Sequence, residues 1–262
     1  MLLFDAGNSR CKWAWIDKGI WLRQGVLNNA DNAAWQTLKD SFALLDAPHK
    51  ILVSNVAGAA MERHLHELCD IWPCPAEYIV AQKEQCGVRN TYEQTAQLGC
   101  DRWAALVAAW HRARQACLVV NCGTATTVDT LSETGEFLGG LILPGIELMQ
   151  TSLLGNTSQL GAGLSAESGL SADAGEVHDF PRNTADAIAS GAMRATIGAI
   201  QHQYALLARQ SAALCILSGG AANRLLPHLG FQAEQVENIV LQGMQIIGQN
   251  CPTITEKEMV AR

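Results

Sequence analysis

The chain has 262 residues, of which 48% are hydrophobic and 16% are charged, and its formal net charge at pH 7 is −7. This composition is typical of a globular protein with a large core, and it excludes an intrinsically disordered chain. The negative charge, the lack of a basic run and the lack of any apolar stretch near the ~20 residues that cross a bilayer argue against nucleic-acid and membrane partners.

The first half of the chain is predicted to open with a β-hairpin. The apolar run MLLF ends at Asp5, and the turn AGNSR connects it to a second strand over residues 12–16. The segments WLRQGVL and KILVSNVAG predict further strands, each followed by a helix, over residues 33–45 and 61–72. Apolar residues at i, i+3, i+4 and i+7 then predict a helix over residues 101–116.

The second half is predicted to repeat this order. CLVVNCGTATTVDTL predicts a second hairpin, FLGGLILPG a third strand that Gly139 and Gly140 break, and IELMQTSLL the start of a helix. Residues 156–180 are rich in Gly, Ser and Ala and are expected to form a mobile loop. Small residues on one side of a helix over residues 184–210 suit close contact with another helix, within the fold or in a second subunit. CILSGGAANRLLPHL predicts a strand, a glycine turn and a helix, and ENIVLQGMQIIG predicts a last helix.

The domain boundary is expected near Ala116, where the first long helix ends and the second hairpin begins. No flexible linker marks this point. We therefore predict an N-terminal domain of residues 1–116 and a C-terminal domain of residues 117–262.

The nine cysteines form no CxxC pair, and most of them lie in apolar runs. This distribution is typical of reduced, buried thiols rather than of a metal site or a disulfide framework. Asp5 also interrupts the apolar start before the core of a signal peptide could form. We therefore expect a cytoplasmic protein.

Two turns of small residues, each after an apolar strand, predict a pair of phosphate-binding sites. Such turns leave backbone N–H groups pointing into open space, and Gly7 and Gly123 let the backbone come close to a phosphate. Two turns facing each other across a cleft could hold the β- and γ-phosphates of one nucleotide. Asp5 could bind Mg²⁺ at these phosphates or cap its own turn. Lys12 could reach a phosphate or be an exposed lysine of an edge strand.

Three segments resemble the nucleotide-binding motifs of the acetate kinase/sugar kinase/Hsp70/actin superfamily. DAGN resembles its first phosphate motif, NCGTATT its second, and CILSGGAAN its adenosine motif. A P-loop sequence GxxxxGK[ST] and a Rossmann fingerprint are both absent from the chain. The resemblance implies an α/β fold of two ribonuclease-H-like (actin-like ATPase) domains, each a mixed sheet flanked by helices, that face each other across a nucleotide cleft.

A more specific resemblance is to the type III pantothenate kinases. It rests on DAGNSRCKW, NTYEQTAQLGCDRWAAL, NCGTATTVD and GGLILPGIELM, and it extends from residue 1 to about residue 247. It implies transfer of a phosphoryl group from ATP, with Mg²⁺, to pantothenate, giving 4'-phosphopantothenate in the first step of coenzyme A biosynthesis. It also implies a homodimer in which the partner subunit completes the pantothenate pocket.

The resemblance assigns roles to individual residues. Asp101 matches the catalytic base, although its place before a good helix also suits an N-cap. Arg102 could pair with the carboxylate of pantothenate. The positions that match substrate contacts are Tyr92, Gly99, Cys100, Arg102 and Thr184. The positions that match ATP contacts are Asp5, Ala6, Gly7, Asn8, Ser9, Arg10, Cys11, Lys12, Gly123 and Thr124.

One departure from the family concerns a monovalent cation. Many members start the second hairpin with an aspartate that helps to hold K⁺ or NH₄⁺, whereas this chain has Asn121 there. An amide oxygen can coordinate a cation but carries no charge, so the cation requirement is left open. Two other functions for the same fold also stay open: a non-catalytic nucleotide-binding scaffold, and a kinase for a sugar or a small acid.

Overall fold

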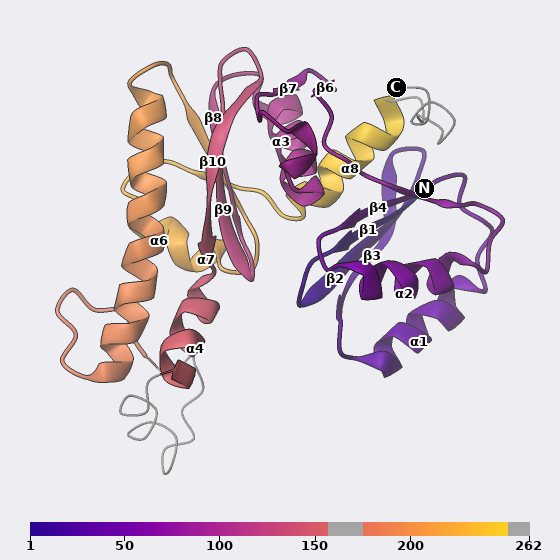
Figure 1. Cartoon of the computed structure of the whole chain (residues 1–262), viewed down its shortest axis with the longest axis horizontal. Helices are drawn as coiled ribbons and strands as arrows, with labels where there is room; N and C mark the ends of the chain where they lie inside the picture. The colour runs from indigo at the N-terminus through magenta and orange to yellow at the C-terminus, as the bar shows by residue number, and fades with distance from the viewer. Residues whose placement is uncertain (157–174, 251–262) are drawn as a thin grey trace, which may run out of the picture. The chain divides into compact units, whose positions relative to one another are not determined.

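The structure is a computed structural model that describes residues 1–156 and 175–250 (Figure 1). The chain divides into two compact units. The first contains Met1–Arg112, Gly135–Phe137 and the segment that begins at Asn238, and the second contains Ala113–Thr134 and Leu138–Glu237. This division differs from a single boundary at residue 116, because the last helix contacts the first sheet.

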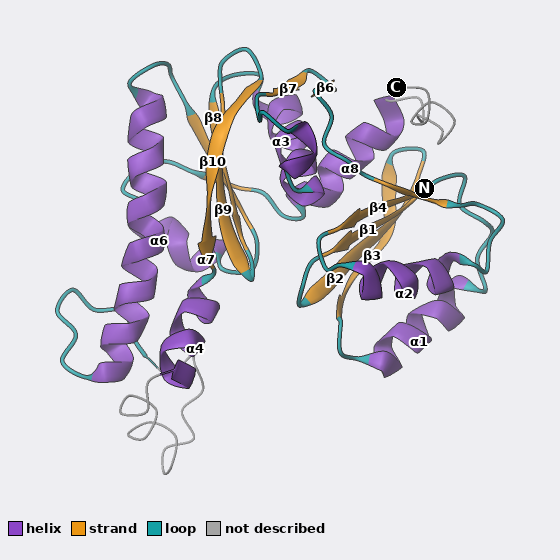
Figure 2. Cartoon of the chain, in the orientation of Figure 1, coloured by secondary structure: helices purple, strands orange, loops and turns teal. Residues whose placement is uncertain are grey.

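The first unit is built on a five-stranded mixed sheet in the order β3-β2-β1-β4-β5 (Figure 2). β1 pairs with β2 antiparallel and with β4 parallel, while β2 pairs with β3 antiparallel and β4 with β5 parallel. The strands are β1 Leu2–Ala6, β2 Arg10–Asp17, β3 Ile20–Asn28, β4 Ile51–Asn55 and β5 Ala76–Tyr78. The helices are α1 Asn32–Phe42, α2 Ala59–Cys69, α3 Cys100–Ala113 and α8 Ile239–Asn250, with a 3₁₀ turn at Thr95–Gln97.

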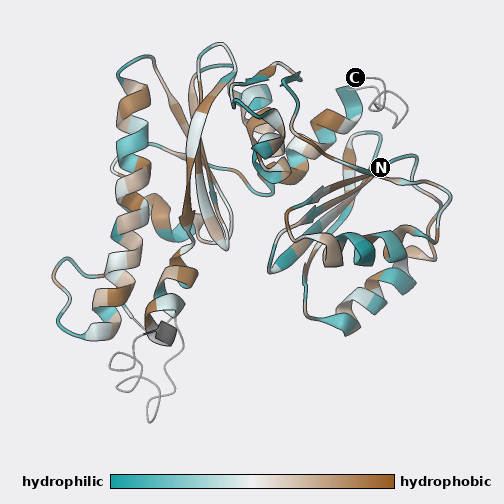
Figure 3. Ribbon diagram, in the orientation of Figure 1, coloured by the Kyte–Doolittle hydropathy of each residue, from teal (hydrophilic) through white to brown (hydrophobic). Residues whose placement is uncertain are grey.

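Helices cover both faces of this sheet. Phe4 and Ala6 of β1 pack in one hydrophobic cluster with Trp35 and Phe42 of α1 and with Leu65 of α2. α8 contacts β1, β2 and β4. Figure 3 shows hydrophobic residues along β1 and β4, whereas α1 and α2 carry both hydrophobic and hydrophilic residues. In each helix the buried residues lie at helical spacing, as in amphipathic helices. Since side chains alternate along a strand, Asp5, which lies between Phe4 and Ala6, points to the other face of the sheet.

The second unit repeats the strand order of the first. Its sheet runs β12-β11-β8-β9-β10, with β8 antiparallel to β9 and parallel to β11, and β11 parallel to β12. The strands are β8 Cys117–Cys122, β9 Ala125–Leu131, β10 Glu136–Pro144, β11 Leu214–Ser218 and β12 Glu234–Gln235. The helices are α4 Ile146–Asn156, α6 Thr184–Ala208 and α7 Ala222–Leu225, followed by a 3₁₀ turn at Leu226–His228. The predicted α/β fold of two mixed sheets flanked by helices is confirmed.

A short β-ribbon extends the sheet at β10. Glu136 and Phe137, which belong to the first unit, pair with β7 Val88–Asn90, and β7 pairs with β6 Glu84–Gln85. The predicted break at Gly139 and Gly140 is wrong, because β10 runs through both glycines to Pro144. Gly139 has φ +125°, which glycine adopts without strain, so the strand continues.

Two sequence predictions fall largely outside the described residues. The predicted mobile loop at residues 156–180 lies mostly in residues 157–174, and the predicted C-terminal tail lies after residue 250. None of the helices that the structure describes is long and apolar enough to cross a membrane.

Candidate active site

Asp5 lies on the face of the first sheet that is opposite to Phe4. It is the cross-strand partner of Lys12 on β2 and of Ser54 on β4. Ser54 is buried, and its hydroxyl donates a hydrogen bond to the Sγ of Cys100 at 3.4 Å. Because Cys100 is the first residue of α3, this bond links the strand beside Asp5 to the helix that carries Asp101.

Asp5 and Asp101 interact electrostatically. Burial, and then the negative charge of Asp101, raise the pKa of Asp5 to about 7, whereas Lys12 opposes the shift. Burial also raises the pKa of Asp101, against the hydrogen bond from the backbone of Arg102 and the charge of its guanidinium. A cation bound near these two half-buried carboxylates would relieve their mutual repulsion.

The donor set at this site fits Mg²⁺ bound together with a polyphosphate. Carboxylate oxygens are the hard ligands that Mg²⁺ prefers. Within residues 1–156 and 175–250, no group of three or more His, Cys, Asp or Glu side chains could hold a metal ion by itself. A magnesium ion at Asp5 would therefore take its remaining ligands from phosphate oxygens and water.

The turn between β1 and β2 presents backbone rather than buried side chains. The N–H of Gly7 donates to the carbonyl of Arg10 at 3.1 Å and closes the turn. Asn8, Ser9 and Arg10 are exposed. Ala6 and Cys11 are fully buried in the core cluster of this unit, so these two predicted ATP contacts are available only through their backbone atoms.

Gly99 and Asp101 lie in close contact at the start of α3. The carbonyl of Gly99 accepts the N–H of Trp103 at 2.9 Å, which makes Gly99 the N-cap and places Asp101 inside the first turn. The Oδ1 of Asp101 accepts the N–H of Arg102 at 2.8 Å. A Cβ atom at Gly99 would lie 2.7 Å from that Oδ1. Only glycine therefore leaves the Asp101 carboxylate in its present position.

Arg102 is held by two aromatic rings. The residue is only 6% exposed, and its Nη1 donates to the hydroxyl of Tyr92 at 3.3 Å. The guanidinium carbon lies 5.9 Å from the ring centre of Tyr92 and 5.7 Å from that of Phe137, within the range of a cation–π contact. Thr91 donates a hydrogen bond to the carbonyl of Phe137. The predicted pair Tyr92 and Arg102 thus lies together, with Phe137 as a third member.

The second phosphate turn, in the second unit, is supported by two glycines. The N–H of Gly123 donates to the carbonyl of Ala125 at 3.0 Å, and the carbonyl of Thr124 accepts the N–H of Gly145 at 2.9 Å. A Cβ atom at Gly145 would lie 2.3 Å from the carbonyl oxygen of Gly123, so glycine is required at this approach. Asn121, half-buried near the end of β8, pairs with Thr127 across the hairpin.

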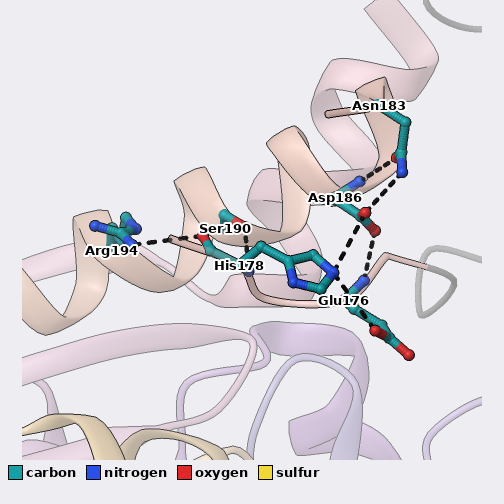
Figure 4. Close-up of polar contacts among 6 residues, drawn as sticks. All are labelled: Glu176, His178, Asn183, Asp186, Ser190 and Arg194. Carbon is teal, nitrogen blue, oxygen red and sulfur yellow. Dashed lines mark hydrogen bonds and ion pairs between the residues drawn. The ribbon is translucent and has the colours of Figure 1, made fainter. Parts of the chain in front are cut away.

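Thr184 is the first residue of α6, also in the second unit, and it is exposed. The preceding segment is tied to α6 by side chains (Figure 4). The ring Nε2 of His178 lies 3.5 Å from a carboxylate oxygen of Asp186, and the backbone N–H of His178 donates to the hydroxyl of Ser190 at 3.0 Å. Arg194 pairs with Asp179 at 2.8 Å. These contacts fix the path of the chain into the helix that begins with Thr184.

The comparisons with known proteins agree on one family. A family model described as type III pantothenate kinase matches residues 1–206. The chain is 45% identical over 267 residues to the type III pantothenate kinase of Nitrosospira multiformis, covering 100% of this chain and 95% of that protein. The chain belongs to the type III pantothenate kinase family. The resemblance drawn from the sequence is therefore confirmed.

A second relative and the fold comparisons agree with this membership. The type III pantothenate kinase of Aromatoleum aromaticum is 43% identical over 249 residues, covering 95% of this chain and 98% of that protein. Among solved structures, a conserved Baf family protein from Campylobacter jejuni superposes with a TM-score of 0.55 at 24% identity, covering 95% of this chain and 98% of that one. At this identity the superposition supports the fold alone.

Two residues near the predicted site of this type III pantothenate kinase family member were not predicted from its sequence. Ser54 lies in a short buried strand, where a serine has no distinctive pattern. Phe137 reaches Tyr92 and Arg102 only through the pairing of β10 with β7. β7 has three residues, so no periodicity could reveal that pairing from the sequence.

Replacing Asp5 by asparagine should stabilise the nucleotide-free protein at high pH. The folded-state pKa of Asp5 is about 7 against an ordinary 3.8, so the folded protein binds the proton more tightly and loses stability as pH rises between these values. In EDTA at pH 8, Asp5→Asn should therefore have a higher melting temperature than the parent, with an unfolding free energy larger by at most about 4 kcal/mol. At pH 3.5 the variant and the parent should have the same melting temperature. Melting curves at both pH values, with exposed Asp46→Asn as control, measure this. A lower melting temperature at pH 8 would contradict the shift.

Replacing Gly99 by alanine should lower kcat without unfolding the protein. The added methyl group displaces the Asp101 carboxylate, and small displacements of a reacting group cost about a hundredfold in rate. Asp46→Ala, an exposed change in the same unit with no role assigned in the site, is the control. Steady-state kinetics and melting curves of both variants measure the effect, and an unchanged kcat in Gly99→Ala would show that the position of Asp101 is not critical.

Proposed function

We propose that this chain catalyses the ATP-dependent phosphorylation of pantothenate to 4'-phosphopantothenate, the first step of coenzyme A biosynthesis. The observation that carries the proposal is that Asp101 interacts both with a second carboxylate, that of Asp5, and with the buried Arg102, in a member of this kinase family. A phosphoryl-transfer site for an acidic acceptor needs a base, a ligand for the metal and a group that binds the acid.

Asp101 acts as the general base in this proposal. It accepts the proton of the primary hydroxyl of pantothenate as that oxygen attacks the γ-phosphorus of ATP in line, and the bond from this phosphorus to the bridging oxygen breaks, so that ADP leaves. The raised pKa of its carboxyl makes it a better proton acceptor than an ordinary aspartate, provided that it is ionised. Asp5 would hold Mg²⁺, which when bound would supply positive charge against the phosphate oxygens.

Arg102 binds the carboxylate of pantothenate. A guanidinium forms two parallel hydrogen bonds with a carboxylate, and the rings of Tyr92 and Phe137 limit its movement. The neighbouring positions Gly99 and Cys100 contribute backbone groups, and the hydroxyl of Thr184 contributes a further contact to pantothenate.

ATP contacts come from both phosphate turns in this proposal. In the first turn they involve the backbone from Ala6 to Cys11, because glycine-containing turns bind phosphate through N–H groups. Lys12 adds a positive charge on β2, as the cross-strand partner of Asp5. In the second turn they involve Gly123 and Thr124. The domain boundary predicted near residue 116 assigns one turn to each domain.

The monovalent cation, the dimer and the location remain proposals on separate grounds. The amide oxygen of Asn121 can coordinate K⁺ or NH₄⁺ but carries no charge, so we expect weaker cation binding than at a carboxylate, and whether the enzyme requires the cation stays open. A homodimer is supported by small exposed residues along α6, including Gly191 and Gly198, where an added Cβ atom meets open space. A net charge of −7 supports the absence of a nucleic-acid partner, and reduced cysteines support a cytoplasmic location.

A coupled assay of ADP release with different acceptors tests the function. We expect release that depends on pantothenate and is absent with a panel of sugars and small acids. Release with a sugar alone would favour the sugar-kinase alternative. Nucleotide binding without any acceptor-dependent release would favour the scaffold alternative. The half-buried Asp101 and the buried Arg102 argue against a scaffold, because a scaffold needs neither a base nor an acid-binding group.

A further inference from the structure

The turn between β1 and β2 is held from one side by the side chain of Asn29, the residue that directly follows β3. Its Nδ2 donates hydrogen bonds to two successive carbonyl oxygens, that of Gly7 at 2.7 Å and that of Asn8 at 2.9 Å. The backbone N–H of Asn29 donates to the carbonyl of Ser9 at 3.1 Å. Three consecutive carbonyls of the turn therefore point towards one residue.

The directions of these carbonyls fix the directions of the neighbouring N–H groups. In a planar trans peptide the C=O and the N–H point in opposite directions. No cis peptide bond occurs in the part of the chain that the structure describes. Because the carbonyls of Gly7 and Asn8 point towards Asn29, the N–H groups of Asn8 and Ser9 point away from it. Two successive N–H groups on one side of a turn form an arrangement that binds anions.

We infer that Asn29 is a positioning residue that directs the N–H groups of Asn8 and Ser9 towards the phosphates of ATP. It touches the turn and not the nucleotide, so it acts through the turn. This inference rests on the proposed function, because it takes the turn as the site of the ATP phosphates.

The other end of the Asn29 amide makes no such contact, so the bonds to the turn are what this side chain contributes. Its Oδ1 is buried and has no hydrogen-bond partner among the residues that the structure describes. Burying an unpaired amide oxygen opposes folding, and an apolar side chain of the same size would avoid that cost. The Nδ2 bonds to the turn are the feature that accounts for an asparagine here.

The test compares Asn29→Leu with its neighbour Asn28→Leu. Leucine keeps the approximate size of asparagine but removes both bonds to the turn. The side chain of Asn28 accepts the N–H of Ala30 at 3.0 Å at an exposed position, and its replacement serves as the matched control. We expect Asn29→Leu to raise the KM for ATP at least about tenfold, since misdirected binding groups lose much of their effect, and to change the KM for pantothenate less than about twofold. A purely structural role would lower the melting temperature without this selective effect on ATP.

The outcomes separate this inference from the proposed function. An unchanged KM for ATP in Asn29→Leu would overturn the inference and leave the function intact. If the parent binds MgATP in calorimetry but does not phosphorylate pantothenate, the function fails, and weaker MgATP binding by Asn29→Leu still supports the inference. If Asn29→Leu does not fold, Asn29→Ser replaces it. Its hydroxyl can donate one bond but is too short to span both carbonyls, so a KM for ATP equal to that of the parent would again overturn the inference.

Discussion

Replacing Asp101 by asparagine is expected to lower pantothenate-dependent ADP release by at least about a hundredfold, the usual contribution of a general base. Asparagine keeps the size of the side chain and an oxygen that can accept the N–H of Arg102. It cannot accept the proton of the attacking hydroxyl. The loss should therefore be found in kcat, measured by the coupled assay at saturating ATP and pantothenate.

A second readout distinguishes loss of the base from loss of the nucleotide site. The charge of Asp101 raises the pKa of Asp5, so its removal should leave Asp5 more fully ionised near neutral pH. MgATP binding by Asp101→Asn, measured by calorimetry, should therefore be as tight as in the parent or tighter. Asp46→Asn, an exposed change elsewhere in the first unit, should keep full activity. Equal turnover in Asp101→Asn and the parent would remove Asp101 from the mechanism.

Replacing Arg102 by lysine is expected to raise the KM for pantothenate about tenfold to a hundredfold. Lysine keeps the positive charge, but it lacks the planar fork that matches a carboxylate and that lies near the rings of Tyr92 and Phe137. Hydrogen bonds to charged groups contribute about 1.5–3 kcal/mol, which corresponds to this range. The KM for ATP should change less than about threefold, because Arg102 is assigned to the acid-binding part of the site.

The control for this prediction is Arg63→Lys, an exposed arginine on α2. Arg102 is buried, so melting curves must accompany the kinetics to show that Arg102→Lys remains folded. A rise in the KM for ATP with an unchanged KM for pantothenate would assign Arg102 to the nucleotide instead of the acceptor.

Local patterns allowed most of the fold to be predicted from the sequence. The two hairpins were predicted because apolar strands and turns of small residues lie next to each other in the chain. Trp103, Leu106 and Trp110 are buried on α3, as the helical spacing predicts. The short strands β6, β7 and β12 were missed, because two or three residues carry no measurable alternation.

Long-range packing accounts for what the sequence could not supply at the site. The Asp5 and Asp101 carboxylates come close because β4 lies beside β1 and its Ser54 contacts the start of α3. Phe137 reaches the site because β10 pairs with β7. Asn29 reaches it because its side chain contacts Gly7, more than twenty residues earlier in the chain. The sequence could propose Asp101 as an N-cap, but only the structure shows that Gly99 holds that position.

The position of the transferred phosphate tests the central claim most directly. The parent protein is incubated with ATP, Mg²⁺ and pantothenate, and the product is analysed by phosphorus–proton NMR. The proposed function predicts a single phosphate ester on the primary hydroxyl, with its phosphorus coupled to the adjacent methylene protons. An ester on the secondary hydroxyl, or ADP formed without any phosphorylated pantothenate, would contradict the assignment of Asp5, Asp101 and Arg102 to this reaction.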